Sequence, residues 1–156
     1  MTEKDADARE VVRQRDDGAG GSHLTDTRSN YFLRGEHTNG AFSLTEILFQ
    51  PGAQGTPMHV HTREEETYYV IEGELDVHVG DERHVIGPGG SIVLPRYLKH
   101  RVTPAPDKIT RALMIVSPPG LEGMLMQLDN ARPGELDVET LGRLSAEFGV
   151  QILTEN

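Results

Sequence analysis

Residues 51–73 read PGAQGTPMHVHTREEETYYVIEG, and this stretch holds two histidines, His59 and His61, separated by a single residue. Four further residues separate His61 from Glu66. A third histidine, His100, lies downstream, after a second segment rich in glycine and proline. Three imidazoles and one carboxylate form a complete ligand set for a divalent transition metal. The sequence therefore indicates a metalloprotein.

The spacing of these residues suits β-strands. Alternate residues of a strand project from one face, so His59 and His61 point together, and Glu66 swings in beside them when the chain re-enters a strand. Glu64 and Glu65 compete for the carboxylate role. Glu65 projects from the opposite face, which makes Glu66 the preferred ligand and Glu65 the reserve. Apart from Glu66, the acidic run is interpreted as a solvated stretch, and the third histidine must arrive from another strand.

Short apolar runs alternate with turn residues from Tyr31 onward. Turns are expected at Pro51-Gly52, at Gly80-Asp81 and at residues 87–90, which read GPGG. Many short strands with such turns are typical of an antiparallel sandwich or barrel. No amphipathic helix separates the runs, which argues against an alternating βαβ fold. Besides the histidine pair, the expected strands are residues 31–34, 42–49, 66–72, 75–79, 83–86, 91–94, 100–103 and 109–117.

Helix signals follow the strands. Residues 121–128 are short and apolar, and residues 137–149 have a good N-cap in Asp137 and a good C-terminal cap in Gly149. An apolar stripe on the second helix is expected to pack on the outside of the β core. Its members are Val138, Leu141, Leu144 and Phe148. The chain is thus divided into a charged N-terminal arm (1–25), a barrel (26–120) and helices that pack on the barrel (121–156).

Composition narrows the class of protein. The 156 residues are enough for one domain with an independent core. A net charge of -10 argues against nucleic acid and against an anionic membrane surface. The chain has no cysteine, which excludes disulfides, thiolate zinc sites, iron–sulfur clusters and a cysteine nucleophile. No secretory signal and no apolar run of membrane-spanning length is visible, so a cytoplasmic location is expected.

The ligand candidates resemble the two sequence motifs of the cupin superfamily. The first motif is an H-x-H followed by a glutamate and a glycine, matched by His59, His61, Glu66 and Gly73. The second is a glycine, a proline and a histidine, matched by Gly89 or Gly90, Pro95 and His100. The short segment between the motifs is similar to that of small single-domain cupins, and the helical tail resembles that of quercetin-dioxygenase-like members.

The resemblance implies an all-β fold: a double-stranded β-helix, or jelly-roll, barrel with a short C-terminal helical segment and a metal inside one end. It also implies a homodimer. The chain departs from the second motif at two positions, because Tyr97 stands where glycine is frequent and Pro104 where asparagine is frequent. Both are backbone or loop positions, so the ligand set is retained.

Six further residues are candidates for contact with a small-molecule substrate. Tyr68 and Val70 share a strand face with Glu66, and Val102 shares one with His100. The remaining candidates are Met58, Met114 and Tyr97, the last at the mouth of the pocket. For each of the six, plain barrel core is the alternative interpretation.

Three functional hypotheses remain open, because the cupin fold hosts many chemistries. The first is an O2-dependent oxygenase acting on a small aromatic or phenolic substrate such as a flavonol or polyketide, with Glu66 as metal ligand and as proton acceptor. The second is a metal-dependent polyketide cyclase or isomerase without net redox chemistry. The third is a non-enzymatic small-molecule binder. Imidazole and carboxylate ligands suit Fe, Ni, Mn, Co, Zn or Cu, so the sequence does not identify the metal.

Overall fold

A computed structural model describes residues 10–14, 26–132 and 134–154. Of the predicted N-terminal arm, residues 1–9 and 15–25 lie outside the described residues, and residues 10–14 form neither helix nor strand. The strands are β1 (Thr27–Leu33), β2 (Ser43–Phe49), β3 (His59–His61), β4 (Glu65–Glu72), β5 (Leu75–Val79), β6 (Glu82–Ile86), β7 (Ser91–Leu94), β8 (His100–Pro104), β9 (Thr110–Ser117) and β10 (Val150–Ile152). The helices are the 3-10 turn η2 (Gly35–His37), α1 (Leu121–Asn130) and α2 (Val138–Glu147).

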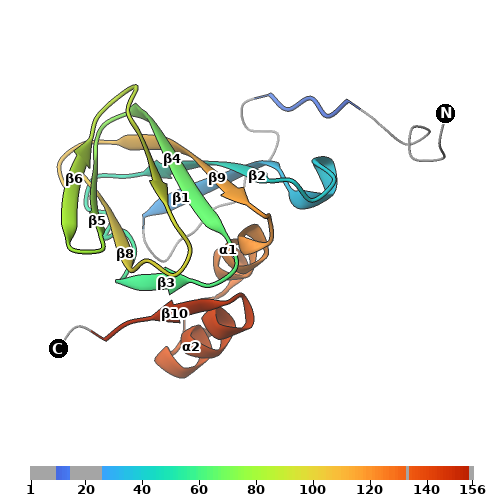
Figure 1. The fold of residues 1–156 in the computed structure, drawn as a ribbon. Helices are drawn as coiled ribbons and strands as arrows, with labels where there is room; N and C mark the ends of the chain where they lie inside the picture. The colour runs from blue at the N-terminus through green and yellow to red at the C-terminus, as the bar shows by residue number, and fades with distance from the viewer. Residues whose placement is uncertain (1–9, 15–25, 133, 155–156) are drawn as a thin grey trace.

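The strands form two antiparallel five-stranded sheets that face each other (Figure 1). One sheet has the order β1-β2-β9-β4-β7 and the other β10-β3-β8-β5-β6. Strands adjacent in sequence often lie in different sheets, as β3 and β4 do, so the chain winds between the two layers. This arrangement confirms the predicted mostly-β jelly-roll barrel.

The core lies between the two sheets and follows the period-two alternation of strands. In β4, Tyr68 and Val70 are buried while Tyr69 and Ile71 are exposed on the outer face. The fully buried apolar side chains each contribute about 1.5–3 kcal/mol by their removal from water. They include Val70, Leu75, Val77, Leu94, Val102, Met114 and Val116.

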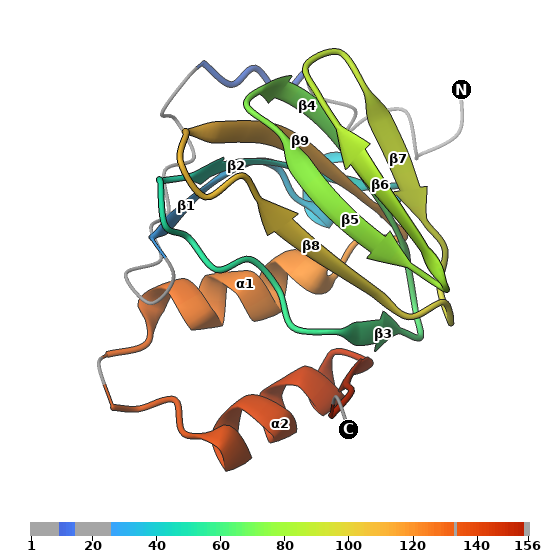
Figure 2. The same ribbon diagram turned by 90° about the vertical axis from the view of Figure 1, so that its left-hand side faces the viewer.

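Both helices lie at the end of the barrel where β3 runs (Figure 2). Helix α1 is attached by polar contacts: Tyr31 Oη of β1 donates a hydrogen bond to Asp129, and Glu122 accepts hydrogen bonds from the amides of Gly35 (3.0 Å) and Gly120 (2.7 Å). Neither α1 nor α2 has the length and apolar character that crossing a membrane requires.

The C-terminal segment differs in part from its prediction. Asp137 caps α2, because its Oδ1 accepts a hydrogen bond from Thr140 N at 2.7 Å, and Gly149 follows the helix with a φ of 73°. Val138, however, is 88% exposed, so only the later members of the predicted apolar stripe are packed against the protein. The prediction also missed β10, which is only three residues long and becomes a strand through pairing with β3.

We predict that Gly73, the last residue of the first motif, is required for stability. Its φ is 75°, and a Cβ there would lie 2.3 Å from Ile109 O. Gly89 has a similar φ of 81° but open space around it. Gly89→Ala should cost about 1–2 kcal/mol, the strain of a left-handed backbone, and Gly73→Ala roughly twice that or more. Urea unfolding measures both, and equal losses would contradict the steric argument.

Candidate metal centre

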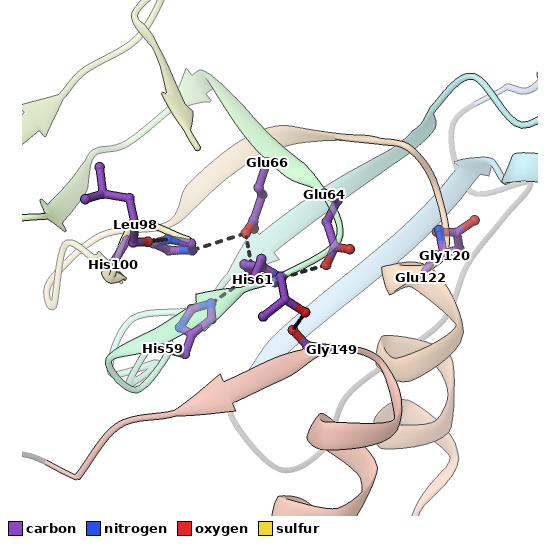
Figure 3. A network of polar contacts seen from close by, with 10 residues as sticks. His59, His61, Glu64, Glu66, Leu98, His100, Gly120, Glu122 and Gly149 are labelled. Atoms are coloured by element: carbon purple, nitrogen blue, oxygen red, sulfur yellow. Dashed lines mark hydrogen bonds and ion pairs between the residues drawn. The ribbon is translucent and has the colours of Figure 1, made fainter. Parts of the chain in front are cut away.

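Four side chains from both sheets converge inside the barrel (Figure 3). His59 and His61 project from β3, and His100 begins β8, where it is the register partner of His59. Glu66 reaches the same point from β4 in the opposite sheet. All four are buried, and their ligand atoms lie within 4.8 Å of one another. The structure thus brings together the four residues that the sequence singled out, although forty residues separate the first from the last.

Each of the three imidazoles is held in one tautomer by an acceptor at its Nδ1 atom. A carbonyl or an ionised carboxylate can only accept, so each Nδ1 carries the hydrogen and each Nε2 of a neutral ring presents a lone pair. The three contacts are His59 Nδ1 to Pro57 O (2.7 Å), His61 Nδ1 to Glu64 Oε1 (2.7 Å) and His100 Nδ1 to Leu98 O (3.1 Å).

The separations of the donor atoms fit a divalent metal. His61 Nε2 lies 3.0 Å from His59 Nε2 and 3.0 Å from Glu66 Oε2, and His100 Nε2 lies 3.5 Å from Glu66 Oε2. Metal–ligand distances of about 2.0–2.2 Å place neighbouring donors about 3.0–3.5 Å apart. His100 Nε2 is fully buried and has no hydrogen-bond partner, as expected of an atom reserved for a ligand.

Burial and mutual hydrogen bonds set the charges of this cluster. Burial alone raises the pKa of Glu66, but the close contacts with His100 and His61 outweigh burial and hold this pKa well below its usual range. Burial also lowers the pKa of His61, but hydrogen bonds to Glu64 and Glu66 outweigh it and raise the pKa to about 9. Burial, helped by the nearby His100, lowers the pKa of His59 to about 4. Without a metal, His61 therefore holds a proton at neutral pH.

The interpretation of the acidic run as solvated was wrong for Glu64. Glu64 is only 4% exposed and accepts the Nδ1 hydrogen of His61. Glu65 is half-buried, and both of its oxygens accept hydrogen bonds from Arg96, each at 2.6 Å. Glu65 is therefore not available as the reserve ligand. Because side chains alternate along a strand, Glu64 projects from the same face as Glu66. Three consecutive glutamates are typical of a solvated stretch, and that pattern hid the alternation.

The short strand β3 is held on both of its edges. β10 pairs along one edge, where Thr62 N and Thr62 Oγ1 donate hydrogen bonds to Gly149 O at 2.9 and 2.8 Å. On the other side, Tyr97 N donates a hydrogen bond to His61 O at 2.8 Å. These backbone contacts fix the positions of the two histidines that β3 carries.

The six substrate-contact candidates fall into two groups. Four are buried in the barrel: Tyr68, Val70, Val102 and Met114. Met58 is partly buried beside β3, and Tyr97 is 70% exposed with a φ of 67°. The structure thus separates Tyr97 from the interior set, and substrate contact stays a prediction for all six.

A family model for the cupin domain matches residues 45–116, from β2 to β9. An RmlC-like cupin from Shewanella frigidimarina has a similar fold, with a TM-score of 0.62 and 22% identity over 74% of this chain and 96% of that one. Residues 45–116 therefore form a cupin domain. The ectoine synthase of P. lautus is similar over 94% of this chain and 92% of its own chain, with a TM-score of 0.58 and 22% identity. Such identities show the fold alone. No curated protein sequence matches this chain.

We predict that His61→Ala abolishes metal binding without unfolding the protein. The variant removes the central donor of the cluster and leaves the apolar core untouched. The control is His84→Ala, which removes an exposed histidine on β6 whose ring contacts Glu82 outside the cluster. Elemental analysis after metal loading should find the metal in the wild type and in His84→Ala only, with circular dichroism showing all three folded. Full metal content in His61→Ala would overturn the ligand assignment.

Metal affinity should rise with pH up to about pH 9. The pKa of His61 in the metal-free protein is raised to about 9, so the metal must displace one proton at every pH below that value. The apparent association constant should therefore increase about tenfold per pH unit from pH 7 to pH 9 and then level off. Calorimetric titration in buffers of different ionisation enthalpy counts the released proton. A pH-independent affinity over this range would contradict the assigned protonation.

Proposed function

We propose that this protein is an O2-dependent oxygenase that acts on a small aromatic or phenolic substrate at a metal held by His59, His61, Glu66 and His100. The observation that carries this proposal is the small number of proton-carrying groups around the cluster. Isomerases, cyclases and decarboxylases move protons between substrate atoms and depend on a positioned acid or base. An oxygenase needs only to remove one hydroxyl proton from its substrate.

The described residues contain four buried carboxylates, and three of them are committed elsewhere. Glu46 accepts a hydrogen bond from Asn30, its neighbour on β1. The alternation of side chains along β2 places Glu46 on the outer face of the sheet, away from the barrel interior. Glu122 caps backbone amides at α1, and Glu64 holds His61. No lysine or arginine is buried among these residues. Glu66 is therefore the carboxylate that remains to accept a substrate proton.

Four protein donors leave open coordination positions, and a redox-active metal there would supply the positions and the electron transfer that a reaction with O2 requires. The chain itself contributes binding and proton acceptance. Glu66 accepts the hydroxyl proton of the substrate. Tyr68 lies beside it: burial, together with the charge and hydrogen bond of Glu66, raises the pKa of its phenol, so the phenol stays protonated and donates to the carboxylate.

A second candidate is a metal-dependent cyclase or isomerase. The observation in its favour is the same pair of Tyr68 and Glu66, because a phenol next to a carboxylate is able to pass a proton in either direction. In this reaction the metal would only polarise a carbonyl group, so a redox-inactive metal would support turnover.

The choice of metal separates the two candidates. We predict O2 consumption with phenolic or polyketide-like compounds by the Fe-, Mn-, Co- or Ni-loaded protein and no turnover by the Zn-loaded protein. An oxygen electrode and product analysis by mass spectrometry measure both. Turnover that persists in His61→Ala would come from metal free in solution. His84→Ala shows the effect of losing a histidine outside the cluster. Turnover supported by Zn without O2 uptake would replace the oxygenase with the cyclase or isomerase. The homodimer implied by the family resemblance stays a prediction.

A further inference from the structure

Two hydroxyl groups on the inner face of β2 have no hydrogen-bond partner. Ser43 is 1% exposed and Thr45 is 0% exposed, and neither Ser43 Oγ nor Thr45 Oγ1 contacts a donor or acceptor. Strand parity places both on the same face as Ile47 and Phe49, which belong to the core. Both hydroxyls therefore point into the interior between the two sheets.

The sheet register places these hydroxyls in the same sheet as the carboxylate of the metal cluster, two strands away. Ser43 pairs with Val116 of β9, and Val116 pairs with Glu66 of β4, so Ser43 and Glu66 occupy one row two strands apart. Thr45 shares the next row, through Met114, with Tyr68. Two strand spacings separate the backbones by about 10 Å. The barrel interior thus has a charged side at β4 and an uncharged polar side at β2.

Two other hydroxyls in the same barrel, one buried and one partly buried, have hydrogen-bond partners. Thr110, at the start of β9, is also fully buried, yet its Oγ1 donates to Glu74 O and accepts from Glu74 N, both at 3.2 Å. Thr56 Oγ1 accepts a hydrogen bond from Val102 N at 3.0 Å. A buried hydroxyl without a partner is destabilising, whereas valine or alanine in the same place would not be. Ser43 and Thr45 therefore have no structural role that the fold itself explains.

We propose that Ser43 and Thr45 bind an uncharged oxygen function of the substrate, at the end remote from the metal. The inference rests on the proposed function in one respect, namely that the substrate binds at the metal cluster. A hydroxyl both donates and accepts, so it suits a hydroxyl or carbonyl group on the ligand. The buried described residues include no lysine or arginine, which disfavours a remote carboxylate or phosphate. The substrate class is a small molecule with oxygen at both ends and an apolar middle that faces Val116 and Met114.

Binding of a matched pair of probes to the Zn-loaded full-length protein tests this proposal without requiring turnover. The probes are 3-hydroxyflavone, which presents a chelating hydroxy-ketone, and its 4′-hydroxylated analogue, which adds a remote hydroxyl. The wild type should bind the hydroxylated probe about 3–10-fold more tightly by calorimetry, the range of one hydrogen bond. Thr45→Val and the double variant Ser43→Ala/Thr45→Val should lose that preference and retain the affinity for the parent probe.

Thermal unfolding of the same variants separates a binding role from a structural one. Thr45→Val should unfold at or above the wild-type temperature, whereas the control Thr110→Val, which removes a paired hydroxyl, should unfold at a lower temperature. A wild type without preference for the hydroxylated probe, or a Thr45→Val that keeps the preference, would overturn the proposal. If the preference depends on Thr45 but the protein consumes no O2, the binding role of Ser43 and Thr45 stands and the oxygenase function is rejected.

Discussion

One electrostatic constraint governs the site. Three buried Nε2 atoms and a carboxylate face one another, and each ring presents a lone pair there because its Nδ1 hydrogen is donated elsewhere. Lone pairs and negative charge at separations of 3.0–3.5 Å repel unless positive charge lies among them. Either a proton on His61 or a divalent metal supplies that charge. Because both occupy the same place, proton and metal compete, and higher pH favours the metal.

The barrel maintains this arrangement mainly through its backbone. Two of the three Nδ1 acceptors are main-chain carbonyls, Pro57 O and Leu98 O, each two residues before the histidine that it orients. The strand that carries His59 and His61 is only three residues long, but it pairs with β8 on one edge and with β10 on the other. Ring orientation and strand position are thus set together, so the donors are preorganised for an ion.

The sequence predicted those parts of the site that depend on local periodicity. The H-x-H spacing and the parity of β4 were enough to select Glu66 over Glu65, because side-chain direction alternates along any strand. Non-local contacts were beyond that reasoning. β10 becomes a strand only by pairing with β3, far away in the sequence. The hydroxyls of Ser43 and Thr45 are unpaired because their neighbours on β9, Val116 and Met114, have no polar side-chain atom to bond with them. Val138 fits a helical stripe but is exposed to solvent in the first turn of α2.

Glu64 changes the charge balance of the centre. A divalent ion held by three neutral imidazoles and Glu66 alone would leave one positive charge in the barrel interior, where such charge is costly. Glu64 is buried 2.7 Å from the far nitrogen of His61 and supplies a second negative charge through that ring. The ion and the two carboxylates then sum to zero. A neutral centre needs no counter-ion from the substrate, which agrees with the uncharged hydroxyls that β2 presents two strands away from Glu66.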